Sequence, residues 1–359
     1  MVTPVGKRWW LHAIAALLAG LGALMAVQSW SWWGAAFPGF FLMPNRVVPS
    51  AGLPGWAGAP DGRPVFQQVL VAVDGSPVAT ATAGYDQARH HSIGEVVQYD
   101  LAGAHGVERR TFPLRRLTGM EYGGIFGAYF LTGLAYLTLA VVAGRRWHAD
   151  PRLRAFTVFG WAGAAFTFSA MDLYGAGTFF RLHAAAETLL LAACVHLVVV
   201  WPRNRWFGEA DLVRLVYGAG GMFALAYQAF LYDPRGYATC HNICQGLMAA
   251  PTLLLAAQLA LGARAAATVA EAQVLRRLLD GALVGFVGPG LIFGLSSLAG
   301  GDVPVSTAAW LNFVFPLAAA ASLGRLEAFT GSAVSGPPTA ARETMSAPGR
   351  FAAAHLQRA

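Results

Sequence analysis

The chain has 359 residues, of which 56% are hydrophobic and only 12% are charged, and its formal net charge is +7. Soluble domains carry about 25% charged residues, so this composition excludes an ordinary soluble protein. Three cysteines are too few for a disulfide-rich scaffold.

Apolar stretches recur along the chain, and each is long enough to cross a hydrocarbon layer of about 30 Å. They predict eight membrane spans, at 9–29, 122–144, 155–174, 182–201, 212–231, 245–263, 278–298 and 306–324. The expected fold class is therefore an all-α polytopic membrane bundle, with a soluble domain at 31–118 inserted after the first span.

The first span has features of both an anchor and a signal peptide. Lys7 and Arg8 precede its apolar run, as in a signal peptide, but Leu24 stands at the −3 position of the nearest cleavage site, where a small residue is preferred. The run continues into tryptophans at 30–33, which resemble an interfacial aromatic belt. We favour a retained anchor, with cleavage as the alternative.

The placement of basic residues predicts the orientation, because they concentrate in short cytoplasmic loops. With the N-terminus inside, predicted cytoplasmic segments hold sixteen of the 25 basic residues, and the short outer loops hold only Arg181 and Arg235. The other seven lie in 31–118. Both termini are therefore expected in the cytoplasm and the inserted domain outside. The +7 charge reflects this topology, and no nucleic-acid partner is expected.

Residues 64–117 alternate between strand and turn signals. They predict a strand at 65–73, an Asp74-Gly75 turn, a helix at 79–91, a strand at 96–101, a turn at 103–106 and an antiparallel partner at 107–117. The inserted domain is therefore expected to be α+β.

Two motifs in this segment resemble bacterial PDZ domains. Val73-Asp74-Gly75-Ser76-Pro77-Val78 is similar to their strand-turn, and Gly94-Glu95-Val96-Val97 to the entry of a later strand. The resemblance implies a PDZ-like domain that captures a peptide by β-augmentation. Residues 31–63 depart from the pattern, and Phe37-Pro38-Gly39-Phe40 is the nearest candidate for a carboxylate-binding loop. Peptide binding and a purely structural cap both stay open.

The whole layout resembles the membrane-sensor half of bacterial multi-span sensor histidine kinases, such as pheromone receptor kinases. Polar and aromatic residues over 172–202, from Asp172-Leu173-Tyr174 to Trp201-Pro202, are similar to the third and fourth spans of such sensors. The resemblance covers 9–324 and implies a signal-transduction role. Residues 325–359 have the composition of a disordered cytoplasmic tail and hold no kinase signature, so no catalytic output domain is expected.

Polar residues near the outer ends of two spans are the candidate ligand site, because burial in a membrane makes them costly. Asp172 and Arg181 flank a short hairpin, and His183 and Glu187 are one helical turn apart. We predict that these four residues line a shared outer cavity. Arg181 would contact an anionic ligand group, and His183 with Glu187 would form a proton-holding pair. The alternatives are a salt bridge between Asp172 and Arg181 and a packing role for the other two.

No metal or cofactor is expected. Cys240-His241-Asn242-Ile243-Cys244 is placed in an outer loop, but a zinc site needs four ligands and no second cluster completes one. A loop disulfide and two unpaired thiols both stay open. His183 and His196 lie thirteen residues apart and point to different helix faces, which argues against a bis-histidine haem.

Enzyme motifs are incomplete. His183 and Glu187 lack the His-Glu-x-x-His pattern of membrane metalloproteases. No histidine within a predicted span follows Gly294-Leu295-Ser296-Ser297 to make a serine protease. We therefore expect no catalytic residues.

The expected function is a sensor or receptor-like protein of bacterial signal transduction, and the alternative is a membrane scaffold that binds a partner through its PDZ-like domain. One lysine against 24 arginines is typical of a GC-rich bacterial genome, so the expected location is the bacterial inner membrane. Expected partners are the lipid bilayer, a peptide or small extracytoplasmic ligand, and a separate cytoplasmic signalling protein.

Overall fold

The computed structural model describes residues 9–53, 55–56, 65–103, 105–145, 147, 150–201, 209–298 and 309–333. The chain is mostly helical, at 67%. Several basic residues behind the predicted orientation lie outside the described residues, namely Lys7, Arg8, Arg146, Arg203 and Arg205. The start of the last predicted span and the tail from 334 onward also lie outside them.

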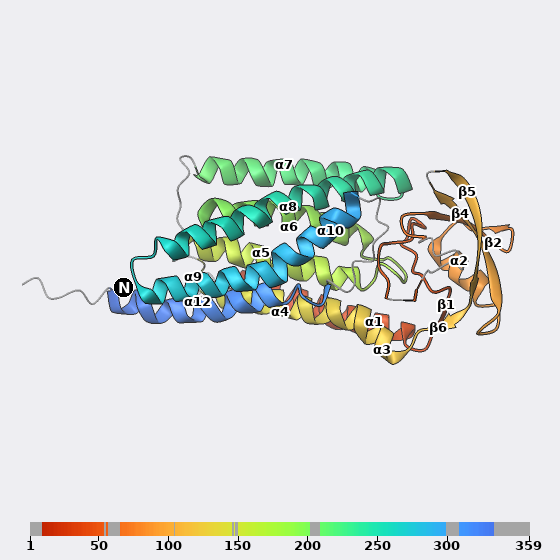
Figure 1. Cartoon of the computed structure of the whole chain (residues 1–359), viewed down its shortest axis with the longest axis horizontal. Helices are drawn as coiled ribbons and strands as arrows, with labels where there is room; N and C mark the ends of the chain where they lie inside the picture. The colour runs from red at the N-terminus through yellow and green to blue at the C-terminus, as the bar shows by residue number, and fades with distance from the viewer. Residues whose placement is uncertain are drawn as a thin grey trace, which may run out of the picture.

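Long helices make up the bundle (Figure 1). They are α1 (Trp9–Ser29), α3 (Gly119–Tyr122), α4 (Ala128–Gly144), α5 (Pro151–Ala170), α6 (Phe180–Val200), α7 (Glu209–Phe230), α8 (Pro234–Arg264), α9 (Val269–Ala282), α10 (Gly288–Leu298) and α12 (Val314–Ala333). Short π-helical segments, η3 (Gly123–Gly127) and η4 (Leu283–Val287), join α3 to α4 and α9 to α10 without a break. Because α12 runs to Ala333, it extends past the predicted end of the last span at 324.

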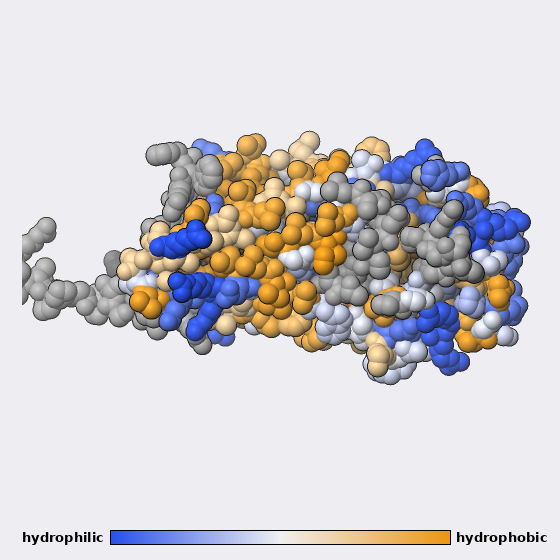
Figure 2. All heavy atoms as spheres, in the orientation of Figure 1, coloured by the Kyte–Doolittle hydropathy of each residue, from blue (hydrophilic) through white to orange (hydrophobic). Residues whose placement is uncertain are grey.

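Among the described residues, five helical stretches are long and apolar enough to cross a membrane: Trp9–Trp32, Gly119–Gly144, Phe180–Val200, Pro234–Arg264 and Val269–Ser296. Apolar residues cover the middle of the bundle on the face drawn in Figure 2, and hydrophilic residues gather towards both ends. This distribution is typical of a multi-pass membrane protein.

Neighbouring helices pack in sequence order, α4 on α5, α5 on α6 and α6 on α7 and α8. The bundle closes because α12 packs against both α4 and α9, while α1 lies against α4 and α5. Glycine allows helices to approach closely: a Cβ on Gly160 would lie 2.7 Å from the carbonyl oxygen of Tyr136. Small residues at such crossings are the usual means of packing helices in a membrane.

The inserted domain sits at one end of the bundle (Figure 1). Its main sheet has four antiparallel strands in the order β3-β2-β4-β5, made of β2 (Val69–Val73), β3 (Ser76–Pro77), β4 (Val96–Gly103) and β5 (Gly106–Pro113). Helix α2 (Ala81–Ala88) contacts β2. A second pairing joins β1 (Ala36–Phe37) to β6 (Arg115–Arg116). The predicted order of strand, turn, helix and hairpin is present, although β2 begins four residues later than expected.

The Asp74-Gly75 turn has the geometry that its sequence predicts. Both residues have positive φ, at 48° and 76°, as the mirror-image turns of tight hairpins require. Val73 pairs with Ser76 across the turn.

A histidine ties this turn to the end of α2. His91 Nδ1 lies 2.6 Å from Glu95 Oε1, and its Nε2 lies 2.6 Å from Asp74 Oδ2. Hydrogen bonding to Glu95 and to Asp74 raises the pKa of His91. Hydrogen bonding to His91 lowers the pKa of Glu95, and the backbone N–H of Ser92 adds to that effect. The charged imidazole therefore holds two carboxylates from different elements.

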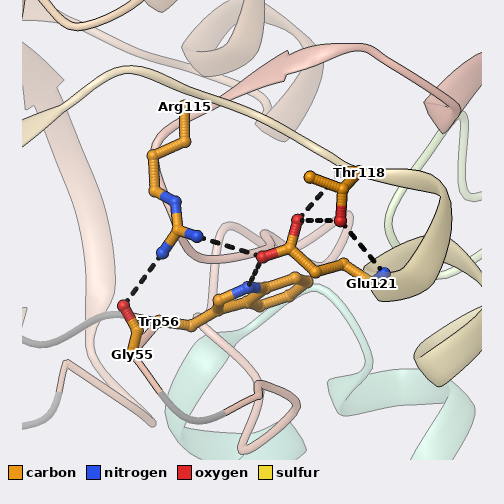
Figure 3. A network of polar contacts seen from close by, with 5 residues as sticks. All are labelled: Gly55, Trp56, Arg115, Thr118 and Glu121. Carbon is orange, nitrogen blue, oxygen red and sulfur yellow. Dashed lines mark hydrogen bonds and ion pairs between the residues drawn. The ribbon is translucent and has the colours of Figure 1, made fainter.

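The chain from the sheet into the second span is held by Glu121 (Figure 3). Its carboxylate accepts hydrogen bonds from Trp56 Nε1 at 2.8 Å, Arg115 Nη2 at 3.0 Å and Thr118 N at 2.8 Å. Thr118 in turn accepts from the Glu121 N–H, which completes a capping box at the start of α3. The orientation of the domain on the second span is thus fixed at its first turn.

The stability of the β2–β3 turn is expected to depend on pH. The raised pKa of His91 stabilises the fold fully below about pH 6.5, and this stabilisation is lost as pH rises through the folded-state pKa. The lowered pKa of Glu95 stabilises it above about pH 4.5 and is lost as pH falls. Amide-exchange protection at 72–78, corrected for intrinsic rates, should therefore be greatest between these values and fall towards pH 9.

The matched controls are His91→Gln and His90→Gln. His91→Gln should remove the alkaline loss of protection. His90 is the adjacent histidine, and its side chain has no polar partner among the described residues, so its replacement should leave the profile unchanged. An unchanged profile in His91→Gln would show that the histidine does not hold the turn.

Candidate functional site

A cavity of about 200 Å³ lies where the inserted domain meets the bundle. The domain supplies one side of it, through Met43, Pro49, Ser50, Ala51 and Gln67. Helices α4, α5, α6, α8 and α10, the η4 segment, the turn after α5 and residues 309–312 before α12 supply the rest. Its aromatic rings are Tyr129, Tyr136, Phe166, Tyr174, Tyr237, Phe286 and Phe293. We call this space the interface cavity.

Glu187 is the buried carboxylate on the wall of the interface cavity, with 1% of its side chain exposed. Oε1 accepts a hydrogen bond from Gln245 Nε2 at 2.6 Å, and Oε2 accepts one from the Tyr227 hydroxyl at 3.1 Å. His241 Nδ1 lies 2.9 Å from Oε1, at ion-pair distance but without hydrogen-bond geometry. Both oxygens are therefore satisfied, as a buried carboxylate requires.

The partners of Glu187 come from three neighbouring helices. Glu187 stands in the second turn of α6, Tyr227 near the end of α7, and His241 and Gln245 one turn apart on the same face of α8. Helix α8 begins at Pro234, where Asp233 caps it by accepting the N–H of Gly236. This cap sets the helical phase that brings His241 and Gln245 to the carboxylate.

His183 lines the same cavity and is 4% exposed. Its Nδ1 lies 3.1 Å from the carbonyl oxygen of Phe166, and the ring stacks on Phe166 with centroids 4.5 Å apart. A carbonyl only accepts, so Nδ1 carries the proton and Nε2 of the neutral ring is an acceptor. Glu187 and His183 share the cavity wall, but no hydrogen bond joins them among the described contacts.

The other two predicted site residues lie elsewhere, so the prediction of one shared cavity for all four is wrong. Asp172 is buried, and its Oδ2 accepts the N–H of Phe179 at 2.7 Å, which shapes the turn between α5 and α6. Arg181 is exposed, contacts Gln228 and stacks over Tyr232. No ion pair joins Asp172 to Arg181 in the described part of the chain. Both residues order the hairpin, and neither lines the cavity.

Two further expectations are corrected. The loop Phe37-Pro38-Gly39-Phe40 is core, since Phe37 and Phe40 are fully buried, so it offers no open carboxylate-binding site. The segment from Cys240 to Cys244 belongs to α8 and not to an outer loop, and both thiols are free. Helix α8 begins eleven residues before the predicted span, because the cap at Asp233 and the proline at 234 start a helix there.

His241, Tyr227 and Gln245 are site residues that sequence reasoning missed. His241 was weighed only as a metal ligand, and among the described residues no three His, Cys, Asp or Glu side chains form a metal-binding group. A polar residue inside an apolar span was the available signal for Gln245. His196, which was set apart from His183, indeed faces away, with Nδ1 3.0 Å from the hydroxyl of Tyr217 on α7.

Comparison with protein-family models, curated proteins and solved structures gives no match. The function is therefore argued from the geometry of the site.

Replacement of Glu187 by leucine should destabilise the bundle strongly. The change leaves Gln245, Tyr227 and His241 buried without their acceptor, and breaking a buried network of this kind costs about 3 kcal/mol. Glu187→Gln keeps the size and most of the polar contacts and should cost about 1 kcal/mol. Reversible unfolding of the purified full chain in mixed micelles measures both values.

The control is Asp211→Leu on α7, because Asp211 is 82% exposed and its ion pair within the described part of the chain is with Arg214. Its cost should stay within about 0.5 kcal/mol. Equal losses for Glu187→Leu and Asp211→Leu would mean that the buried network contributes nothing specific.

Proposed function

We propose that this protein is a sensor or receptor-like protein of the bacterial inner membrane, and that the interface cavity is the place where the signal is received. In this proposal the chain crosses the membrane eight times, both termini are cytoplasmic, and the inserted domain lies outside. The observation that carries the proposal is a cavity that contains a buried Glu187 network and is closed partly by the bundle and partly by the inserted domain. A molecule in that space touches both parts.

Direct contacts hold the inserted domain on the bundle beside the cavity. Phe41 stacks on Tyr174 with ring centroids 4.4 Å apart, and Asn45 donates to the carbonyl of Leu231 at 3.2 Å. The Tyr237 hydroxyl points to the sulfur of Met43 at 3.3 Å. Since Met43, Tyr174 and Tyr237 also line the cavity, occupancy acts on the same contacts that hold the domain.

Backbone strain at the domain side of the cavity supports a role in switching. Arg46 and Gln67 are not glycines, yet they have left-handed φ of 66° and 61°. Gln67 lines the cavity, and its side chain donates to Ser50 Oγ, which lines it too. Such strain costs on the order of 1 kcal/mol per residue and occurs preferentially at functional sites. In this proposal, a ligand that binds in the cavity relieves the strained backbone at Gln67.

A PDZ-like fold of the inserted domain is part of the proposal. The order of β2, the Asp74-Gly75 turn, α2 and the β4–β5 hairpin supports it. Because the loop at 37–40 is buried against the rest of the domain, we assign the domain the role of a cap on the bundle and not of a peptide-capture module.

The competing function is a scaffold whose inserted domain binds a partner while the helices do no signalling. Among the described strands β5 pairs only with β4, and its exposed edge favours this reading, since an open edge accepts a further strand. The two functions differ in whether Glu187 matters once the protein is folded and in place.

The orientation is tested with a reporter that is active only in the cytoplasm. We expect activity when it is fused after Ala333, beyond α12, and none when it is inserted at the β4–β5 turn. A periplasm-active reporter at the same two sites should give the opposite result. If both reporters favour the reverse orientation, the inserted domain faces the cytoplasm and the extracytoplasmic receptor proposal fails.

The sensor role is tested by comparing transcript profiles of cells that carry the wild-type gene, a deletion or Glu187→Gln at equal protein level. A sensor predicts that Glu187→Gln reproduces the deletion profile, because the variant is folded but its cavity no longer contains the Glu187 carboxylate. Asp211→Asn is the matched control on the bundle surface and should give the wild-type profile. If the deletion changes the transcript profile and Glu187→Gln does not, the result favours the scaffold function.

A further inference from the structure

The charged and titratable residues that line the interface cavity favour a ligand without net charge. Among the described residues that line it there is no lysine or arginine, and the acidic and basic side chains are Glu187, His241 and His183. His241 Nδ1 lies 2.9 Å from Glu187 Oε1, so a protonated His241 imidazole balances the charge of the Glu187 carboxylate. Arg181, which would have bound an anionic group, lies outside the cavity on Gln228 and Tyr232.

A cationic ligand is also poorly matched. Glu187 is the one acidic lining residue, and its oxygens already face Gln245, Tyr227 and His241. A bound cation would have to displace one of these buried partners and leave it unsatisfied, which is costly in an apolar interior.

The size and lining of the cavity suit a small aromatic or compact apolar body. Its volume of about 200 Å³ exceeds the roughly 150 Å³ of an apolar protein cavity that holds benzene. The aromatic lining supplies ring faces and edges for such a body, and aromatic pairs add to the gain from burial alone.

Polar groups without partners indicate that the ligand also hydrogen-bonds. Nδ1 of His183 faces a carbonyl, so Nε2 is an acceptor, and no described residue donates to it. Asn242 and Asn312 line the cavity where it is more exposed, and neither side-chain amide has a hydrogen-bond partner among the described residues. A hydroxyl or N–H group on the ligand satisfies the histidine acceptor.

We propose that the interface cavity binds a small uncharged amphiphile, with a compact apolar or aromatic body and one hydroxyl or N–H group that donates to His183. This inference rests on the proposed sensor function and specifies the ligand class of its site. The apolar body lies among the aromatic side chains, and the polar group lies at the wall formed by α5 and α6.

The test uses four probes of one shape: benzyl alcohol, toluene, benzoate and benzylammonium. Each is titrated by ligand-observed NMR against the full chain in lipid nanodiscs, with empty nanodiscs subtracted. Benzyl alcohol is expected to bind most tightly. Toluene should bind several-fold more weakly because it lacks the donor, and both ions at least tenfold more weakly because their charge enters a site without a free counter-charge.

Two glycines of α10 provide a matched pair of variants. Gly290 lines the cavity, and a Cβ there meets only the Thr252 side chain, with its methyl at 3.8 Å and its hydroxyl oxygen at 4.0 Å, so Gly290→Leu fills the cavity without a backbone clash at Cβ. Gly294 lies one turn on, has open space around its Cβ position and is not a lining residue. Gly290→Leu should abolish benzyl alcohol binding, and Gly294→Leu should keep it. His183→Phe should reduce the affinity for benzyl alcohol to that for toluene.

Distinct results overturn the inference. Tighter binding of benzylammonium would make Glu187 the counter-ion of an amine, and tighter binding of benzoate would point to an anionic ligand. Equal binding of benzyl alcohol by the Gly290→Leu and Gly294→Leu proteins would place the probe outside the cavity. These outcomes concern ligand binding to the purified protein and do not depend on the transcript profiles, so the ligand class and the sensor role fail separately.

Discussion

The constraint on which this bundle depends is the burial of one carboxylate. Glu187 lies with 1% exposure among apolar helices, and a charge in such a place is tolerated only with its partners in position. Those partners stand on α7 and α8, so the polar contacts of a single side chain fix how three helices meet. Van der Waals packing and interhelical hydrogen bonds both hold helices together in a bilayer. The Glu187 network supplies such hydrogen bonds between α6, α7 and α8 on one side of the cavity.

Polar and aromatic contacts at both junctions with the bundle also position the inserted domain. The chain leaves the sheet through Arg115 and enters the second span at Glu121, whose carboxylate joins Arg115, Trp56 and the helix cap. Trp32, at the end of the first span, is buried against Phe41 and Tyr85 and does not belong to an interfacial belt, whereas Trp30 and Trp33 are exposed. Polar contacts at one junction and aromatic contacts at the other leave the domain little freedom on the bundle.

Sequence patterns over a few residues predicted local structure well, but they could not predict which distant side chains come into contact. The Asp74-Gly75 turn and the β4–β5 hairpin follow from sequence signals that act over a few residues. The helical positions follow from apolar runs, and five of them are long and apolar enough to span a membrane. Glu187 was chosen from its cost of burial, but its partner His241 is 54 residues away, and the segment around it looked like a loop. Asp172 and Arg181 failed as cavity residues because charge alone does not tell which groups a local turn already uses.

The polar groups in and around the cavity fall into two sets: those that have hydrogen-bond partners in the described structure and those that have none. Glu187, Tyr227 and Gln245 satisfy one another, and the threonines at 167 and 252 bond to carbonyls of their own helices. They hold the walls in place. The acceptor nitrogen of His183 and the side-chain amides of Asn242 and Asn312 have no hydrogen-bond partner among the described residues. Of these groups, His183 is buried, so leaving its acceptor without a donor is costly, as is the left-handed backbone of Gln67 on the same cavity. Both costs are consistent with the sensor role that we propose.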